Sequence, residues 1–142
     1  MNLSKAQVIN LILGFFVTPM GFWVDVKYDD MSELDLFMEA GFTCINEEDE
    51  RKIVCNEQGK EFLFLHFKEI SNDFILFMRK QGMECVASDV EKWFVEKYDL
   101  DDIETGADIA FLIANKLSRF GYECVVPIPE RKDYKYIMRK IL

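Results

Sequence analysis

The sequence predicts an α+β fold, a single domain over residues 1–142 in which a mixed, largely antiparallel sheet packs with about six helices. Three observations predict it. Helix-start signals recur along the chain, apolar segments with strand alternation lie between them, and the strands come as hairpins early but singly later. Because strands and helices alternate after Glu61, a doubly wound α/β sheet is the alternative.

Each expected helix begins at a small polar residue or an acid that can cap it. Ser4 with Gln7 forms a capping box and predicts a helix over about residues 5–13. The other helices are expected to begin at Ser32, Ser71, Ser88, Thr105 and, near the C-terminus, Asp133. The last of them would carry an apolar stripe at helical spacing, formed by Tyr134, Ile137, Met138 and Ile141.

The early strands are expected as hairpins. Residues 22–28 alternate apolar and polar side chains, which is typical of a strand with one solvated face, and residues 15–17 are expected to pair with them. A hairpin is also expected over residues 43–55, with a turn at its charged centre. This register places Cys44 opposite Cys55, so that the two thiols could form a disulfide if oxidised.

The later strands are expected singly. Glu61–Phe67 is apolar on both faces and therefore predicts a central strand, with "NEQGK" as the turn before it. Met83–Ala87 and Tyr122–Ile128 are the last two expected strands.

The phrases "GFTCI", "GMECV" and "GYECV" begin at Gly41, Gly82 and Gly121. In each, the residue after the glycine and the residue four before it are apolar, which is the pattern of a helix that ends with a left-handed glycine. The phrase therefore predicts three joints from helix to strand. Strand alternation turns its cysteines toward the preceding helix, so we expect buried structural thiols at Cys44, Cys85 and Cys124.

The sequence contains none of the common motifs for catalysis. It has no closely spaced cysteine pair, no glycine-rich phosphate loop and no metalloprotease motif, so neither a metal nor a cofactor is expected. The single histidine, His66, is expected in the core or at the end of the central strand. The alternative is a small enzyme or ligand-binding domain with a cleft around His66 and nearby acids or thiols, for which Cys55 and Cys85 are the candidate thiols.

Charge restricts the partners. The chain carries a formal charge of −9, with +3 in residues 130–142 and −12 before them, so direct binding of nucleic acid is disfavoured. Residues 6–24 are uncharged, but Gly14, Pro19 and Gly21 interrupt them, and no membrane span is expected. Without a secretory signal, the four cysteines are expected to be reduced in the cytoplasm.

These features favour a non-enzymatic acidic protein that binds a basic protein surface, of the inhibitor, immunity-protein or nucleic-acid-mimic type. A homo-oligomer formed through a sheet edge or the final helix is compatible with this function. The side chains expected to contact the partner are aromatic and acidic. They are Trp23, Asp25, Tyr28, Asp29, Asp30, Glu47, Glu48, Asp49, Asp99, Asp101, Asp102 and Glu104.

Overall fold

The structure is a computed structural model that describes residues 2–17, 22–23, 32–45, 47–48, 52–125 and 134–141. The fold is α+β, as predicted. The described residues form five α-helices, one short 3₁₀-helix and two antiparallel sheets of three strands each. Because every strand pair described is antiparallel, the doubly wound alternative is wrong. None of the described helices is long and apolar enough to cross a membrane.

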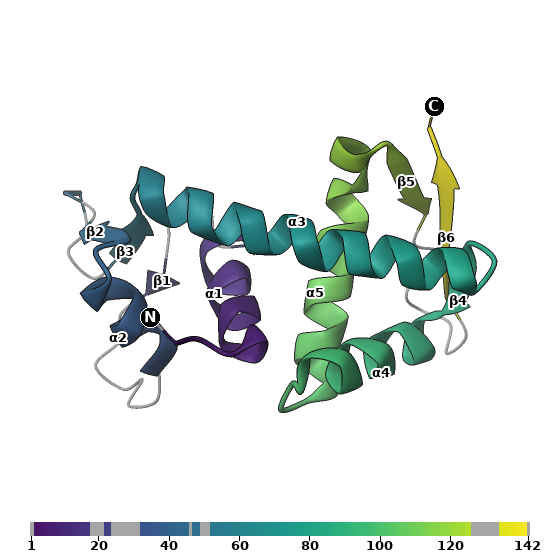
Figure 1. Ribbon diagram of the computed structural model, residues 1–142, viewed down its shortest axis with the longest axis horizontal. Helices are drawn as coiled ribbons and strands as arrows, with labels where there is room; N and C mark the ends of the chain where they lie inside the picture. Colours follow the sequence, from purple (N-terminus) through teal and green to yellow (C-terminus); the bar gives the residue numbers. More distant parts are fainter. Residues whose placement is uncertain are drawn as a thin grey trace. The chain divides into compact units, whose positions relative to one another are not determined.

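The chain divides into two compact units, residues 1–68 and 69–142. Helix α3 (Glu57–Lys80) is one continuous helix (Figure 1). The boundary between the two units falls within it, after Lys68. That all 142 residues form one domain stays a prediction. The other elements of unit 1 are α1 (Lys5–Val17), β1 (Phe22–Trp23), α2 (Ser32–Glu39), β2 (Thr43–Ile45) and β3 (Lys52–Cys55).

Helix α1 begins at the predicted capping box. The Ser4 hydroxyl oxygen accepts a hydrogen bond from the Gln7 backbone N–H at 3.1 Å, and the Gln7 side-chain oxygen accepts one from the Ser4 N–H at 3.0 Å. The helix runs on to Val17, so the strand predicted over residues 15–17 is wrong. The Phe15 ring instead packs on Phe37 of α2, with the ring centroids 5.6 Å apart. Strand β1 pairs with β3.

The hairpin of β2 and β3 forms, with a register that differs by one residue from the prediction. Cys44 lies opposite Val54, and Thr43 lies opposite Cys55. Because side chains alternate between the two faces of a sheet, this shift directs Cys44 and Cys55 to opposite faces. The disulfide considered from the sequence is therefore disfavoured, and both thiols are free.

The central strand predicted over residues 61–67 is wrong, because these residues lie inside α3. The segment read as a turn is the start of that helix. The Asn56 side-chain oxygen accepts a hydrogen bond from the Gly59 N–H at 2.9 Å, which is the bond of a helix N-cap. Asn56 also donates from its side chain to the Gly41 carbonyl at 2.6 Å, which ties the start of α3 to the end of α2.

Helix α3 continues through Ser71, which was expected to begin a separate helix. The Ser71 side chain is fully buried, and its hydroxyl has no hydrogen-bond partner among the described residues. The helix is continuous because its apolar residues keep the helical spacing on both sides of Ser71. The buried stripe consists of Leu63, Phe67, Ile70, Phe74 and Met78.

Unit 2 adds two helices and a second sheet to the end of α3. Strand β6 lies between the other two strands of the sheet (Figure 1). It occupies residues expected to form the last helix, and that prediction is wrong. Tyr136 and Met138 point inward and are buried, whereas Ile137 is exposed, as strand alternation requires. The elements are β4 (Glu84–Val86), α4 (Ala87–Tyr98), α5 (Ile103–Lys116), the 3₁₀-helix η1 (Leu117–Phe120), β5 (Tyr122–Val125) and β6 (Lys135–Lys140).

The three predicted joints from helix to strand are confirmed. Gly41, Gly82 and Gly121 have φ angles of +80°, +77° and +82°, which place them in the left-handed region. At the first joint, the Phe42 N–H donates to the Phe37 carbonyl at 3.3 Å, and the two rings lie 5.2 Å apart. This is the hydrogen bond and apolar contact of a Schellman ending.

Helix α4 lacks the capping box predicted at Ser88. Its N-cap is Val86, which forms no side-chain cap, and the helix begins at Ala87. Helices α4 and α5 pack closely, because Gly106 has no side chain. A Cβ atom on Gly106 would lie 2.7 Å from the Glu91 carbonyl oxygen.

A candidate protein-binding surface

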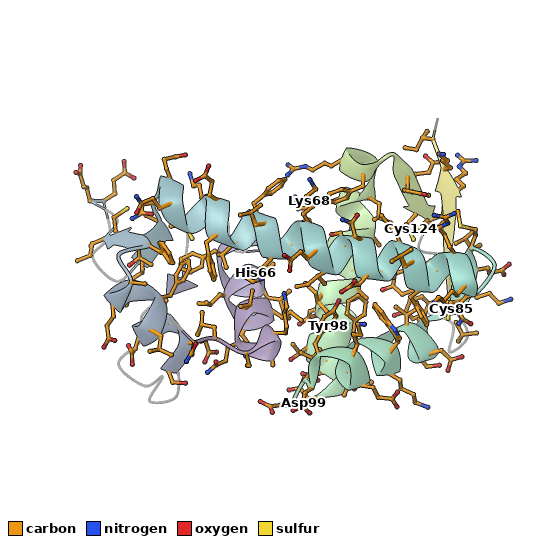
Figure 2. The ribbon with its side chains drawn as sticks, viewed as in Figure 1. His66, Lys68, Cys85, Tyr98, Asp99 and Cys124 are labelled. Carbon is orange, nitrogen blue, oxygen red and sulfur yellow. The ribbon has the colours of Figure 1, made fainter. Side chains whose placement is uncertain are left out.

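The turn that joins α4 to α5 is strongly acidic. Residues 99–108, called here the acidic turn, comprise this turn and the start of α5, and they contain five carboxylates and no basic residue. Figure 2 shows Asp99 at the end of α4, where this turn begins. Within the part of the chain that the structure describes, no lysine or arginine forms an ion pair with these carboxylates. The exposed acidic side chains are Asp99, Asp101, Asp102, Glu104 and Asp108.

Two of these acids shape the turn. Asp99 ends α4 in the left-handed conformation, with φ at 55°, and its N–H donates to the Val95 carbonyl. Asp102 caps α5 instead of the predicted Thr105, because its carboxylate accepts hydrogen bonds from the Thr105 N–H and hydroxyl, both at 2.7 Å. These bonds, the backbone one foremost, lower the pKa of Asp102. Asp101 and Glu104 have no such role and are available to a partner.

Apolar side chains lie next to the acids on α5. Ile103 is 48% exposed and Phe111 is 56% exposed. Glu104, Asp108 and Phe111 follow one another at spacings of four and three residues, so they lie on one face of the helix. We call Ile103, Glu104, Ala107, Asp108 and Phe111 the outer face of α5. The opposite face is buried in unit 2, through Ile109, Ala110, Leu112, Ile113 and Ala114.

The outer face of α5 was not predicted as one binding surface. The carboxylates through Glu104 were recognised in the sequence, whereas Ile103 and Phe111 were not. The signal that could have revealed Phe111 is its distance of seven residues from Glu104, which is two helical turns. An apolar residue at that position interrupts the polar side of an otherwise amphipathic helix.

The end of α4 is attached to α3 by a buried tyrosine. The Tyr98 hydroxyl donates to the Asp73 carboxylate at 2.8 Å, and Tyr98 itself is only 6% exposed. Burial, together with the hydrogen bond to Asp73, raises the pKa of Tyr98, so the phenol keeps its proton and remains a donor. Tyr98 directly precedes Asp99 and therefore fixes the position at which the acidic turn begins (Figure 2).

The remaining predicted binding residues belong to unit 1. Glu47 and Glu48 are exposed between β2 and β3. Trp23 lies in β1, but its side chain is outside the described part of the structure. A role of Glu47, Glu48 and Trp23 in binding stays a prediction. The predicted residues that lie wholly outside the described part of the chain are Asp25, Tyr28, Asp29, Asp30 and Asp49.

His66 lies on α3 and not on the strand predicted for it. Figure 2 shows His66 on α3. The side chain is half-buried, and its ring centroid lies 4.7 Å from that of Phe62. Its Nδ1 atom lies 3.2 Å from the Lys5 Nζ. A lysine amine thus occupies one of the two positions at which the ring could accept a proton from a substrate.

The four cysteine thiols differ in their exposure to solvent. Cys85 is buried as predicted, Cys55 and Cys124 are half-buried, and Cys44 is exposed, so the prediction for Cys44 is wrong. Burial raises the pKa of Cys55 from 9.0 to about 12, raises that of Cys124 to about 11 and also raises that of Cys85. Because the thiolate is the nucleophile, these shifts disfavour a catalytic role for Cys55 or Cys85.

We therefore expect iodoacetamide at about pH 8 to modify Cys44 first, because it is exposed and because protonated, buried thiols react slowly. Peptide mass spectrometry after short exposures measures the order, and protein unfolded in urea, in which all four thiols should react alike, is the control.

The raised pKa of Cys55 also makes stability depend on pH. Between pH 9 and about 12 the unfolded chain loses the Cys55 proton while the folded chain keeps it, so the free energy of unfolding falls as the pH rises. Rapid modification of folded Cys55 would contradict both statements.

Neither a metal site nor a known relative provides a further indication. No group of three or more potential metal ligands occurs within the described ranges. Comparison with protein families, with curated proteins and with solved structures found no match.

Proposed function

We propose that the chain is a non-enzymatic acidic binding protein that contacts a basic protein surface through the acidic turn and the outer face of α5. One observation carries the proposal: carboxylates without ion pairs among the described residues lie beside an exposed phenylalanine on one helix. An inhibitor or immunity protein would use such a surface to block its partner. The free thiols agree with a reducing cytoplasm, which is the location we propose.

Two physical effects would favour this binding, one electrostatic and one apolar. Like charges crowded in the acidic turn create a negative potential that attracts a basic surface and accelerates encounter. This attraction is screened within about 10 Å at 0.1 M salt, so it should be sensitive to ionic strength. Burial of the exposed part of the Phe111 side chain, roughly half of it, would add about 1–2 kcal/mol, and an aromatic anchor of this kind commonly dominates an interface.

The test is capture of a basic protein from an extract of the source cells on the immobilised chain, followed by titration of the purified pair. We expect a 1:1 complex whose affinity falls at least about tenfold between about 50 and about 300 mM salt. Neutralising three acids of the surface, in the variant Asp101→Asn/Glu104→Gln/Asp108→Asn, should abolish capture.

A second triple variant controls for net charge. Asp35→Asn/Glu39→Gln/Glu61→Gln removes three exposed carboxylates from unit 1 and changes the net charge by the same amount. It should capture the partner as the unmodified chain does. Equal loss in both variants would show that only overall charge matters, and capture by the first variant would overturn the proposed surface.

A further inference from the structure

We propose that the segment bound by the outer face of α5 is an amphipathic α-helix with basic residues along one edge of its apolar stripe. This inference rests on the proposed function and specifies the kind of partner. Three features of the outer face lead to it: an apolar ridge, a parallel acidic ridge and a shallow position between two large side chains.

The apolar ridge consists of Ile103, Ala107 and Phe111, which are spaced four residues apart along α5. Rows of this spacing form the ridges that interdigitate when two helices pack. The ends of the ridge are the exposed Ile103 and Phe111, about 12 Å apart along the axis at 1.5 Å per residue. Between them, Ala107 has only a methyl group. A large apolar side chain of a partner helix can therefore lie over Ala107, between the two larger residues.

The acidic ridge runs beside it. Glu104 and Asp108 are four residues apart, about 6 Å along the axis, and both are exposed. Lysine or arginine residues at the same spacing on a partner helix would face both carboxylates while its apolar stripe faces Phe111. This charge pattern fits a basic helix, whereas it repels phosphate groups of nucleic acid or of an anionic membrane surface.

Strand β6 of a second copy of the chain is a poorer occupant. The basic residues Lys135 and Arg139 lie in a strand, and each already forms an ion pair with an acid of its own sheet. Lys135 is paired with Glu84 at 3.0 Å, and Arg139 is paired with Glu123. These side chains are thus engaged within unit 2.

The experiment uses two synthetic peptides of leucine and lysine with the same composition. Both are about 18 residues long, above the length at which isolated helices are marginal. One places leucines at helical spacing with lysines beside them, and the other alternates the two residues as a strand would. Fluorescence anisotropy measures binding of each labelled peptide to the full chain at low and at high salt.

We expect the helical peptide to bind at least about tenfold more tightly than its isomer. Phe111→Ala should weaken the helical peptide by a similar factor, as should Ala107→Lys, which fills the position over which the partner side chain lies. The matched control is Phe64→Ala, which removes a phenylalanine that is 40% exposed on α3 and should change nothing. Far-ultraviolet circular dichroism checks that each variant remains folded.

Equal binding of the two peptides, binding that is unchanged by Phe111→Ala, or no binding of either peptide overturns the helical partner. These outcomes are distinct from failure of the proposed function. If the natural partner is still captured and is lost in the Asp101→Asn/Glu104→Gln/Asp108→Asn variant, the acidic surface stands and the partner binds it in another conformation. If that capture also fails, both proposals fall.

Discussion

Replacing Gly59 by Ala is expected to lower the free energy of unfolding by about 2–3 kcal/mol, although alanine is the better helix former. A Cβ atom at this position would lie 2.2 Å from the backbone oxygen of Phe42 and 3.1 Å from its carbonyl carbon. That oxygen accepts a hydrogen bond from the Asn56 N–H at 3.0 Å, so it cannot move away without loss of the bond. Relief therefore requires separation of α3 from the end of α2.

Urea denaturation followed by circular dichroism measures the effect. The matched control is Gln58→Ala, which makes an alanine at the adjacent, exposed position of the same helical turn and should change stability by no more than about 0.5 kcal/mol. A Gly59→Ala protein as stable as the control would show that Phe42 and α3 are not in close contact.

Replacing Phe94 by Ala is expected to cost about 3–5 kcal/mol, because it leaves a cavity in the core of unit 2. Phe94 is fully buried. Its ring is stacked on Phe74 with the centroids 5.8 Å apart, and it meets the Trp93 ring edge to face at 4.8 Å. Both aromatic contacts and the burial are lost together in the variant.

Phe111→Ala is the matched control for this loss. The same atoms are removed from an exposed position of unit 2, so the free energy of unfolding should change by less than about 1 kcal/mol. Thermal and urea denaturation of the two variants measure the difference. A large loss in Phe111→Ala would mean that this ring supports the fold, and its assignment as a binding residue would then need a different argument.

Two kinds of local signal in the sequence, the first capping box and the three helix-ending glycines, predicted the ends of elements correctly, whereas the helix starts expected at Ser71 and Ser88 were wrong. The box of Ser4 and Gln7 begins α1, and the glycines at 41, 82 and 121 all adopt the left-handed conformation assigned to them. Such signals depend on a few adjacent residues and on the steric freedom of glycine, which are visible without knowledge of the fold. The α+β class followed from their order along the chain.

The elements that failed are those whose type depends on distant partners. Residues 61–67 are apolar on both faces, a pattern that a short window cannot assign to strand or helix. The helical period appears only when the buried stripe is followed from Leu63 to Met78, past a serine that resembles a cap. At the C-terminal end, Ile137 and Met138 fit a helical stripe. The segment is a strand because β4 and β5 provide hydrogen-bond partners on both sides, which only an extended segment can pair with.

The candidate surface was half visible in the sequence. Its acids stand out in composition, because five fall within residues 99–108 without a basic residue. The apolar part of the surface was not visible in the sequence, because the exposure of Phe111 depends on which side of α5 packs against the rest of unit 2. Composition thus locates a charged segment, whereas the packing of the helix decides which apolar residue accompanies it.

The central position of β6 has a consequence for the order in which unit 2 folds. Strands β4 and β5 each pair with β6 and not with each other, and the ion pair between Glu84 and Lys135 joins residues 51 positions apart. Helices form from local contacts, and β5 can pair with β6 across the short separation between Val125 and Ile137, but the pair of β4 and β6 must close a long loop before its hydrogen bonds exist. During synthesis, the helices of unit 2 are made before β6, and until β6 is made the edges of β4 and β5 that pair with it have unpaired backbone hydrogen-bonding groups. Sheet completion is therefore the late and aggregation-sensitive step of folding, and a chaperone that shields those edges would act in this interval.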